Sequence, residues 1–156
     1  MEKPCCIGVV RDAKDLQGID CACGGAPAYL ATPGDSIARK IGVLVLHDIW
    51  GFNIPNAKYI ADHFASNGFH AVLPNLYHGI STLDGWSGTE FNDGEPLEGT
   101  RWDTWWTEIT SDAYWNPFHE RVAAAARLLR DECGCTALCA IGFCNCAGCK
   151  PPTPCH

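Results

Sequence analysis

The chain has 156 residues, of which 47% are hydrophobic and 19% are charged, as in a globular domain with a buried core. Its formal net charge of −7 argues against nucleic acid and anionic membranes as partners, because both need basic patches. No apolar run approaches the ~18 to 20 residues of a membrane span, and "MEKPCCIGVVRDAKD" lacks the apolar stretch of a signal peptide. With an odd count of 11 cysteines, we expect a cytoplasmic protein with reduced thiols.

Three strands are predicted in the first third of the chain. Residues 5–10 and 27–32 look like short strands, and the Gly- and Asp-rich stretch "LQGIDCACGG" between them predicts a turn. Residues 41–47, "IGVLVLH", form a continuous apolar run rich in β-branched residues. Such a run is typical of a strand buried on both faces of a parallel sheet.

A helix and a further strand are predicted after "DIWGFN". Pro55 suits the first helical position, and Gly68 suits the position that ends the helix. One helical face is apolar and consists of Ala57, Ile60, Ala61, Phe64 and Ala65. Residues 69–77 predict the next strand, which Pro74 stops. Together these elements predict a β-α-β unit with a right-handed crossover.

The next segment is predicted to be a Gly-, Asp- and Ser-rich excursion at residues 79–99, followed by a helix that begins at Thr100. Three tryptophans in this helix have two interpretations, as a lid over a substrate pocket or, from their helical spacing, as a core face: Trp102, Trp105 and Trp106. Arg101 would hold a substrate carboxylate or lie in solvent at the helix start.

A last helix and a last strand complete the predicted elements. Asn116 and Pro117 form an N-cap and first-position pair for a helix whose apolar stripe is Phe118, Val122, Ala125, Ala126 and Leu129. Residues 136–143, "TALCAIGF", predict a buried strand. Alternating strands and helices indicate an α/β fold with a mainly parallel sheet.

Directly after this strand, "IGFCNCAGCK" places Cys144 on a turn between a strand and the start of a helix. A sharp turn of this kind lifts a side chain above the sheet, and the N–H groups of the helix start stabilise a thiolate and a developing oxyanion. The pattern itself leaves three interpretations open, namely a nucleophile, a buried core thiol, and a metal or redox site.

The end of the strand at 41–47 offers a second functional element. It leads into His47, Asp48 and Ile49, directly before a helix, where an α/β-hydrolase supplies an oxyanion-hole N–H. Elbow strand and oxyanion strand are neighbours in that arrangement. His47 beside Asp48 would be an acid–base pair or, alternatively, a structural residue at the strand end.

The stretch "VLVLHDIWGFNIPNAKYIADHFASNGFHAVLPNLYHG", together with the later helix and "IGFC", resembles the dienelactone hydrolase (carboxymethylenebutenolidase) family of α/β-hydrolases. The resemblance runs from about residue 20 to 144 and implies hydrolysis of lactones or small carboxylic esters without a cofactor. It also implies that Cys144 is the nucleophile and that the backbone N–H groups of Ile49 and Asn145 form the oxyanion hole. Asp48 takes the place of an acidic residue near the resting thiol, or caps the helix.

The sequence departs from the family pattern at and after Cys144. The elbow of the family reads Gly-x-Cys-x-Gly-Gly, whereas Cys146 and Ala147 stand where the last two glycines are expected. The Asp and His of the triad should follow the nucleophile, and the only later histidine is His156 in a Cys- and Pro-rich tail at 145–156. We therefore expect one partial domain over residues 1–156, an α/β-hydrolase fold with helices on both faces that is incomplete at its C-terminal end, and little or no turnover. A truncated or frame-shifted reading of a longer gene would explain the tail.

Two alternatives to an enzyme are open. Cys144, Cys146, Cys149 and Cys155, with His156, are soft ligands for a zinc site. A half-domain would also leave the strand that ends at Phe143 as an exposed apolar edge, which favours self-association or another protein partner.

Overall fold

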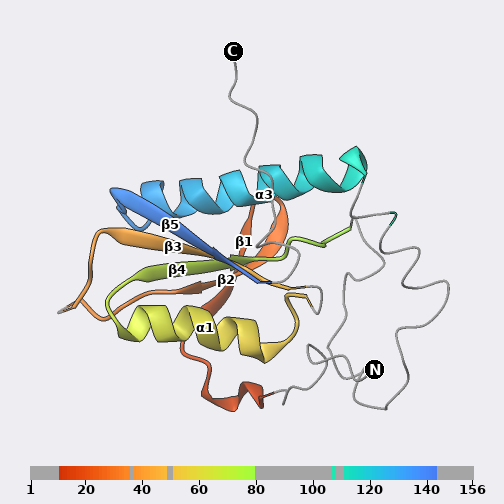
Figure 1. The fold of residues 1–156 in the computed structure, drawn as a ribbon. Coiled ribbons are helices and arrows are strands. Elements are labelled where there is room, and N and C mark those ends of the chain that lie inside the picture. Colours follow the sequence, from red (N-terminus) through yellow and green to blue (C-terminus); the bar gives the residue numbers. More distant parts are fainter. Residues whose placement is uncertain (1–10, 36, 49–50, 80–106, 108–110, 144–156) are drawn as a thin grey trace.

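The computed structural model describes residues 11–35, 37–48, 51–79, 107 and 111–143. Within these residues a five-stranded sheet carries one helix on each face, α3 above and α1 below in Figure 1. The elements in chain order are η2 (Ala13–Asp15), β1 (Ile19–Cys23), β2 (Ala26–Ala31), β3 (Ile41–Leu46), α1 (Pro55–Ser66), β4 (His70–Pro74), α3 (Asp112–Asp131) and β5 (Ala137–Gly142).

The sheet is mixed, with strand order β1-β2-β4-β3-β5. Strands β4, β3 and β5 are parallel neighbours, whereas the β1–β2 and β2–β4 pairs are antiparallel. The α/β class with helices on both faces is confirmed. The prediction of a mainly parallel sheet holds for the β4-β3-β5 half, because the N-terminal hairpin adds its two strands in the antiparallel sense.

Strand β1 corrects the prediction of a turn at "LQGIDCACGG". The turn is confined to Gly24 and Gly25, which have φ angles of 59° and 78°. Two consecutive residues with positive φ make the tight hairpin turn that matches strand twist. Residues 19–23 then pair with β2 in register, from Ile19 opposite Leu30 to Cys23 opposite Ala26. The sequence IDCAC was not recognised as a strand, because Asp20 and the two cysteines do not give a clear alternation of apolar and polar residues. Its pairing with β2 is what makes it a strand.

The predicted unit of β3, α1 and β4 is confirmed in its order and parallel pairing. Pro55 occupies the first turn of α1, and Gly68 follows its C-cap with a φ of 91°. A side chain at Gly68 would meet the carbonyl oxygen of Ile37 at 2.4 Å, so glycine is required for close approach as well as for its backbone angle. Strand β4 ends at Pro74, as predicted.

Helix α3 begins at Asp112, five residues before the predicted start at Pro117. Ser111 is the N-cap, and Pro117 lies inside the helix. A proline there removes a hydrogen bond, yet Tyr114 in the preceding turn is buried with only 1% of its surface exposed. Burial of Tyr114 in the apolar cluster between α3 and the sheet, where its ring contacts Tyr77 and Phe118, therefore outweighs the helix-start signal of Asn116 and Pro117.

Two apolar clusters hold the layers together. On one face, α3 packs through Phe118, Ala125 and Leu129 against Leu44 and Leu46 of β3. On the other, α1 packs against Val43 and Val45 of the same strand and Ala71 and Leu73 of β4. Strand β3 is therefore buried on both faces, as its apolar run predicted.

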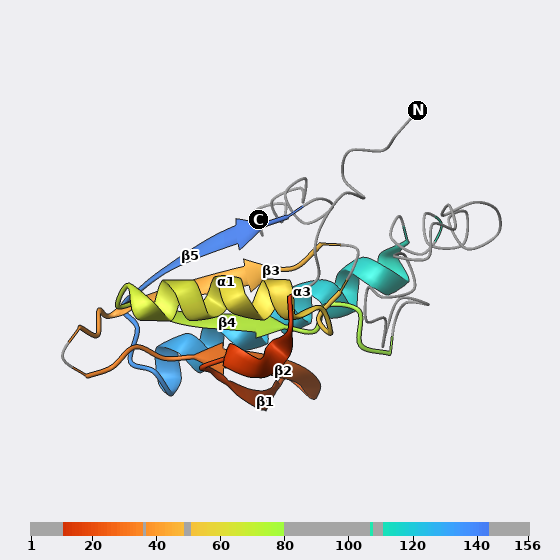
Figure 2. The same ribbon diagram turned by 90° about the horizontal axis from the view of Figure 1, so that it is seen from below.

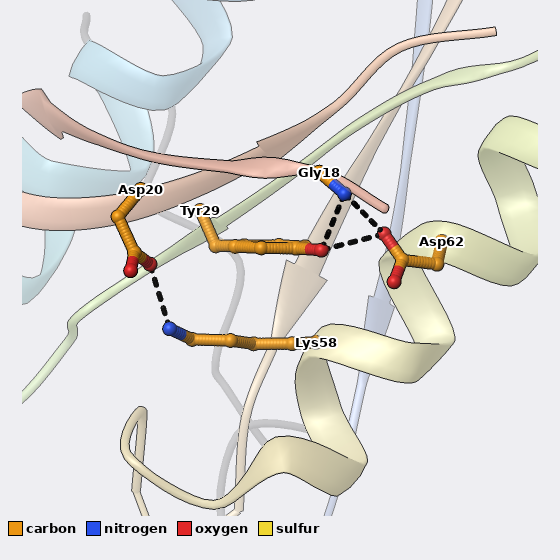
Figure 3. Close-up of polar contacts among 5 residues, drawn as sticks. All are labelled: Gly18, Asp20, Tyr29, Lys58 and Asp62. Atoms are coloured by element: carbon orange, nitrogen blue, oxygen red, sulfur yellow. Dashed lines mark hydrogen bonds and ion pairs between the residues drawn. The ribbon is translucent and has the colours of Figure 1, made fainter. Parts of the chain in front are cut away.

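A polar network ties the segment before β1 to α1 (Figure 3). The carboxylate of Asp62 accepts hydrogen bonds from the Tyr29 hydroxyl at 2.7 Å and from the backbone N–H groups of Gln17 and Gly18 at 2.9 and 3.0 Å. Beside it, Lys58 forms an ion pair with Asp20 at 2.6 Å. The three donors satisfy a carboxylate that is largely buried.

Strand β5 lies at the margin of the described sheet, opposite the hairpin (Figure 2). Its pairing partner there is β3, and Ala137, Cys139 and Ala140 are exposed. The prediction that this strand is buried is wrong for these residues, and the prediction of an apolar sheet edge is confirmed for the described part of the chain.

Several predictions lie outside the described residues. They concern the strand at 5–10, the excursion and helix at 79–109 apart from Gly79 and Thr107, and the tail after Phe143. Among the residues that are described, no helix has the length and apolar character needed to cross a membrane.

Candidate active site

The ends of three parallel strands meet at one edge of the sheet. Strands β4, β3 and β5 are neighbours, and they end at Pro74, Leu46 and Gly142. Pairing continues one residue past β5, because the N–H of Phe143 donates to the carbonyl of Leu46 at 3.1 Å. The predicted proximity of the oxyanion strand and the elbow strand is thus confirmed as far as Phe143, the residue before Cys144.

Of the predicted site residues, the structure describes Asp48. Ile49, Cys144 and Asn145 lie outside the described residues, and so do the thiols of the zinc alternative at 146, 149 and 155. Asp48 follows β3 directly and is half-buried. Its carbonyl accepts the N–H of Gly51 at 3.2 Å, which closes a turn, and Gly51 has a φ of 85°.

His47 is fully buried between the ends of β3 and β4. The backbone N–H of Leu76 donates to its Nε2 at 3.0 Å, so the proton of the neutral ring must sit on Nδ1. Nδ1 lies 2.8 Å from the carbonyl oxygen of Asp48, to which it donates. The ring also contacts Tyr77 edge-on, with centroids 4.8 Å apart.

Burial lowers the pKa of His47 to about 4, because it disfavours the charged ring more than the bond to the Asp48 carbonyl favours it. The ring is therefore neutral at physiological pH, with both nitrogens occupied by backbone groups. A partner in acid–base chemistry needs a free nitrogen facing substrate, and this geometry supports the structural interpretation of His47 instead.

Arg121 is a residue of this edge that the sequence reading missed. From α3, its guanidinium donates to the carbonyl oxygens of Leu76, at 2.8 Å, and His78. The loop after β4 is held further by Asn75, whose backbone N–H donates to Pro27 and whose side chain accepts from the N–H of Tyr77. The sequence did contain a signal for this role, because Arg121 is a charged residue on the same helical face as the apolar residues Phe118, Val122 and Ala125.

No group of three or more metal-ligating side chains has a metal-binding arrangement within the described part of the chain. Four described cysteines instead belong to the apolar cluster under α3, namely Cys21, Cys23, Cys133 and Cys135. Burial raises the pKa of each of these thiols, and the nearby carboxylate of Glu132 adds to the rise for the first three.

Comparison with known proteins places the chain in a family. A model described as the dienelactone hydrolase family matches residues 26–150. "Hydrolase pyvD" of Aspergillus violaceofuscus is 29% identical over 141 residues, which cover 90% of this chain and 51% of that protein. "Hydrolase tropI" of Talaromyces stipitatus is 35% identical over 75 residues, 48% of this chain and 29% of that protein.

The mouse "Carboxymethylenebutenolidase homolog" is 28% identical over 104 residues, which are 65% of this chain and 36% of that protein. The chain thus spans about half or less of the length of these curated relatives. The α/β fold of the chain and the family match over most of its length point to the same family. The chain belongs to the dienelactone hydrolase family.

Proposed function

We propose that this chain provides the nucleophile and oxyanion elements of a hydrolase that acts on lactones or small carboxylic esters. Cys144 is the nucleophile in this proposal, and the backbone N–H groups of Ile49 and Asn145 form the oxyanion hole. Asp48 is the acidic residue beside the resting thiol. The supporting observation is the parallel pairing of β3 and β5, which runs to Leu46 opposite Gly142. Asp48 follows two residues after Leu46 and Cys144 two residues after Gly142, so both follow strands that end at the same sheet edge.

The chemistry is acyl transfer through a thioester. The Cys144 thiolate adds to the ester carbonyl, and the new oxyanion is stabilised by the two N–H groups. Collapse of this intermediate breaks the C–O bond to the alkoxide, which takes up a proton and, in a lactone, stays attached as a hydroxyl group. Water then adds to the thioester carbonyl, releases the acid and returns the thiol.

The second half of this cycle needs a base and its orienting acid. Five histidines precede Cys144, and His47, which directly follows β3, is neutral with both ring nitrogens bonded to backbone. We therefore propose that the 156-residue chain by itself forms the thioester but turns over very slowly. Loss of triad residues costs ~10⁴-fold or more in kcat.

The test is acylation by p-nitrophenyl acetate followed by peptide mapping. About one acetyl group per chain is expected on Cys144, with a matching release of p-nitrophenolate and little release afterwards. Cys144→Ser should lose this early release, whereas Cys139→Ser, which removes an exposed thiol of β5, should keep it. An acetyl label spread evenly over the accessible thiols would contradict the proposal.

Self-association is the second candidate function. Exposed residues of β5, an apolar strand at the margin of the sheet that the described residues form, support it, because an unpaired strand edge is a template for another strand. In this proposal the partner is β5 of a second copy of the chain.

A further inference from the structure

The hydrogen bonds between β5 and β3 fix which backbone groups of β5 point away from the sheet. The N–H of Ala137 donates to the carbonyl of Lys40 at 3.2 Å, and the N–H of Phe143 donates to the carbonyl of Leu46 at 3.1 Å. Both bonds point inward to β3, the parallel neighbour of β5. Backbone groups alternate in direction along a strand. The N–H and C=O groups that point outward therefore belong to three residues: Leu138, Ala140 and Gly142.

No charged side chain protects this outer edge. Residues 137–143 read "ALCAIGF", and Ala137, Cys139 and Ala140 are exposed. Strand β1, at the opposite margin of the described sheet, differs because it carries Asp20, which forms an ion pair with Lys58 at 2.6 Å. A charged residue on an edge strand discourages pairing with another chain, and an uncharged edge favours it. Of these two margins, β5 is therefore the one that favours an added strand.

The side chains of β5 are complementary to those of a second, antiparallel β5 in one register. With Ala140 opposite Ala140 of the second copy, every large side chain of the strand faces a small one. The facing pairs are Leu138 with Gly142, Ile141 with Cys139, and Phe143 with Ala137. The three large side chains are only partly buried against the two apolar clusters of a single copy. Pairing in this register therefore removes further apolar surface from water.

The same register uses all the outward-pointing backbone groups. Facing residues of an antiparallel pair exchange both hydrogen bonds at every second position, and here those positions are the three outward-pointing residues. A two-fold axis through Cys139 instead places Gly142 opposite Thr136, whose N–H is already bonded to Lys40 at 2.9 Å. An axis through Ile141 places one outward-pointing residue beyond the end of the described strand. The register centred on residue 140 therefore gives the most complete pairing.

We infer that the outer edge of β5 is a self-complementary interface, at which two copies of the chain pair their β5 strands antiparallel with the two-fold axis through Ala140. The sheet then continues from one copy into the other, and the two-fold symmetry closes the assembly at two chains. This inference rests on the second candidate function, self-association, and assigns its register. It does not depend on the chemistry proposed at Cys144.

Opposite charges placed at the axis test the register. Ala140→Lys and Ala140→Glu each bring two like charges face to face, so each should raise the dissociation constant of the dimer by ~5-fold or more. An equimolar mixture of the two variants should restore pairing, because opposite charges then face each other. The matched control is the pair Cys139→Lys and Cys139→Glu, at an exposed position whose side chains do not face each other in this register. Sedimentation velocity measures all six samples.

The outcomes separate the register from self-association itself. Restored pairing at residue 140 that exceeds the effect of mixing at residue 139 supports the inference. Restoration mainly at residue 139 would move the axis to Cys139, and a dimer that neither mixture restores would show another interface; each result would overturn the inference and leave self-association intact. An unsubstituted chain that stays monomeric at every concentration would overturn self-association, and this inference with it.

Amide hydrogen exchange tests the register without any substitution. The N–H groups of Leu138, Ala140 and Gly142 point outward and should exchange ~10-fold or more slowly in the dimer than in the diluted monomer. The N–H groups of Cys139 and Ile141 face β3 in both states and should change little. Unchanged exchange at Gly142 in a dimer that protects Leu138 and Ala140 would overturn the inference, because it would place the axis on Cys139.

Discussion

The buried ring of His47 makes a residue-scale prediction about pH. Its pKa is about 4 in the folded chain and about 6.5 in an unfolded one, so between these values only the unfolded chain binds a proton. This pKa difference adds about 3 kcal/mol to the free energy of unfolding above pH 6.5. The added stability is lost as the pH falls from 6.5 towards 4, because the unfolded chain takes up the proton. Urea unfolding at pH 7, 5.5 and 4.5 measures it. His47→Asn should flatten this dependence, and parallel curves for the two proteins would contradict the assignment.

The cysteines give a second prediction at this scale. Because burial raises the pKa of Cys21, Cys23, Cys133 and Cys135, these thiols stay protonated at pH 7.5 and should react slowly with iodoacetamide. Exposed Cys139 should be labelled first among the described cysteines. Time-resolved peptide mapping measures the order, and 4 M urea should remove the differences. Equal rates in the folded chain would show that the cluster under α3 is open.

Single residues of the site were predictable to different degrees. A strand end followed by Asp48 and a Gly-x-Cys pattern at 142–144 predicted two elements at one edge of the sheet, and the strands before them, β3 and β5, do end there as parallel neighbours. The position of Arg121 on the apolar face of α3 could be read from the sequence. Its two partners could not, since they are the backbone carbonyls of residues 76 and 78, and backbone acceptors leave no trace in the pattern of side chains.

At the scale of elements, the two glycines of the β1–β2 turn test how tightly this hairpin packs against α3. A Cβ atom at Gly24 would lie 2.7 Å from the Cβ of Ala124 on α3, whereas one at Gly25 would meet nothing within 4 Å. Both positions have positive φ, so alanine costs about 1 kcal/mol at either one. Gly24→Ala should cost a further ~1 to 3 kcal/mol from overpacking.

Thermal unfolding of Gly24→Ala, Gly25→Ala and the double variant Gly24→Ala/Ala124→Gly measures these terms. The double variant should recover the overpacking part, because the methyl group that clashes is gone. Equal losses at the two glycines would show that the hairpin does not press on α3.

The network at Asp62 predicts how the segment before β1 is attached. Tyr29→Phe removes one donor to the buried carboxylate and one acceptor of the Gly18 N–H. Asp62→Ala leaves the Tyr29 hydroxyl proton and the N–H of Gln17 without their acceptor, whereas the N–H of Gly18 keeps the Tyr29 oxygen. We expect losses of ~1 kcal/mol for the first and ~2 to 3 kcal/mol for the second in the free energy of unfolding. Lys14→Gln, which breaks an exposed ion pair with Asp12, should change little. Chemical denaturation measures all three, and an unaffected Asp62→Ala would contradict the role of the network.

Elements with a strong local pattern were the ones that the sequence predicted well. The apolar run of β3 and the periodic face of α1 needed no knowledge of their neighbours. Strand β1 and the first turn of α3, in contrast, could be predicted only with knowledge of the elements that they contact. Ile19–Cys23 is a strand because β2 pairs with it, and α3 starts before Pro117 because Tyr114 is buried against Tyr77 and Phe118.

At the scale of the molecule, the exposed margin at β5 predicts the oligomeric state of the 156-residue chain. If two copies pair through this strand, sedimentation should give a dimer that Ala140→Lys converts to a monomer, because a charged residue protects a strand edge. Ala22→Lys places the same charge on β1 at the opposite margin and should leave the dimer intact. A monomer in all three proteins, or an equal effect of both lysines, would rule out pairing through β5.

The order of the strands also has a consequence for synthesis on the ribosome. Strand β3 pairs with β4 soon after it emerges, but its other neighbour, β5, lies 96 residues later at the register Ile41–Ala137. At translation rates of ~5 to 20 residues per second, the hydrogen-bonding edge of β3 is available to the rest of the cell for ~5 to 20 seconds. Nascent copies of this chain therefore present an apolar edge during every round of translation, and ribosome-associated chaperones should be found crosslinked to it before β5 emerges.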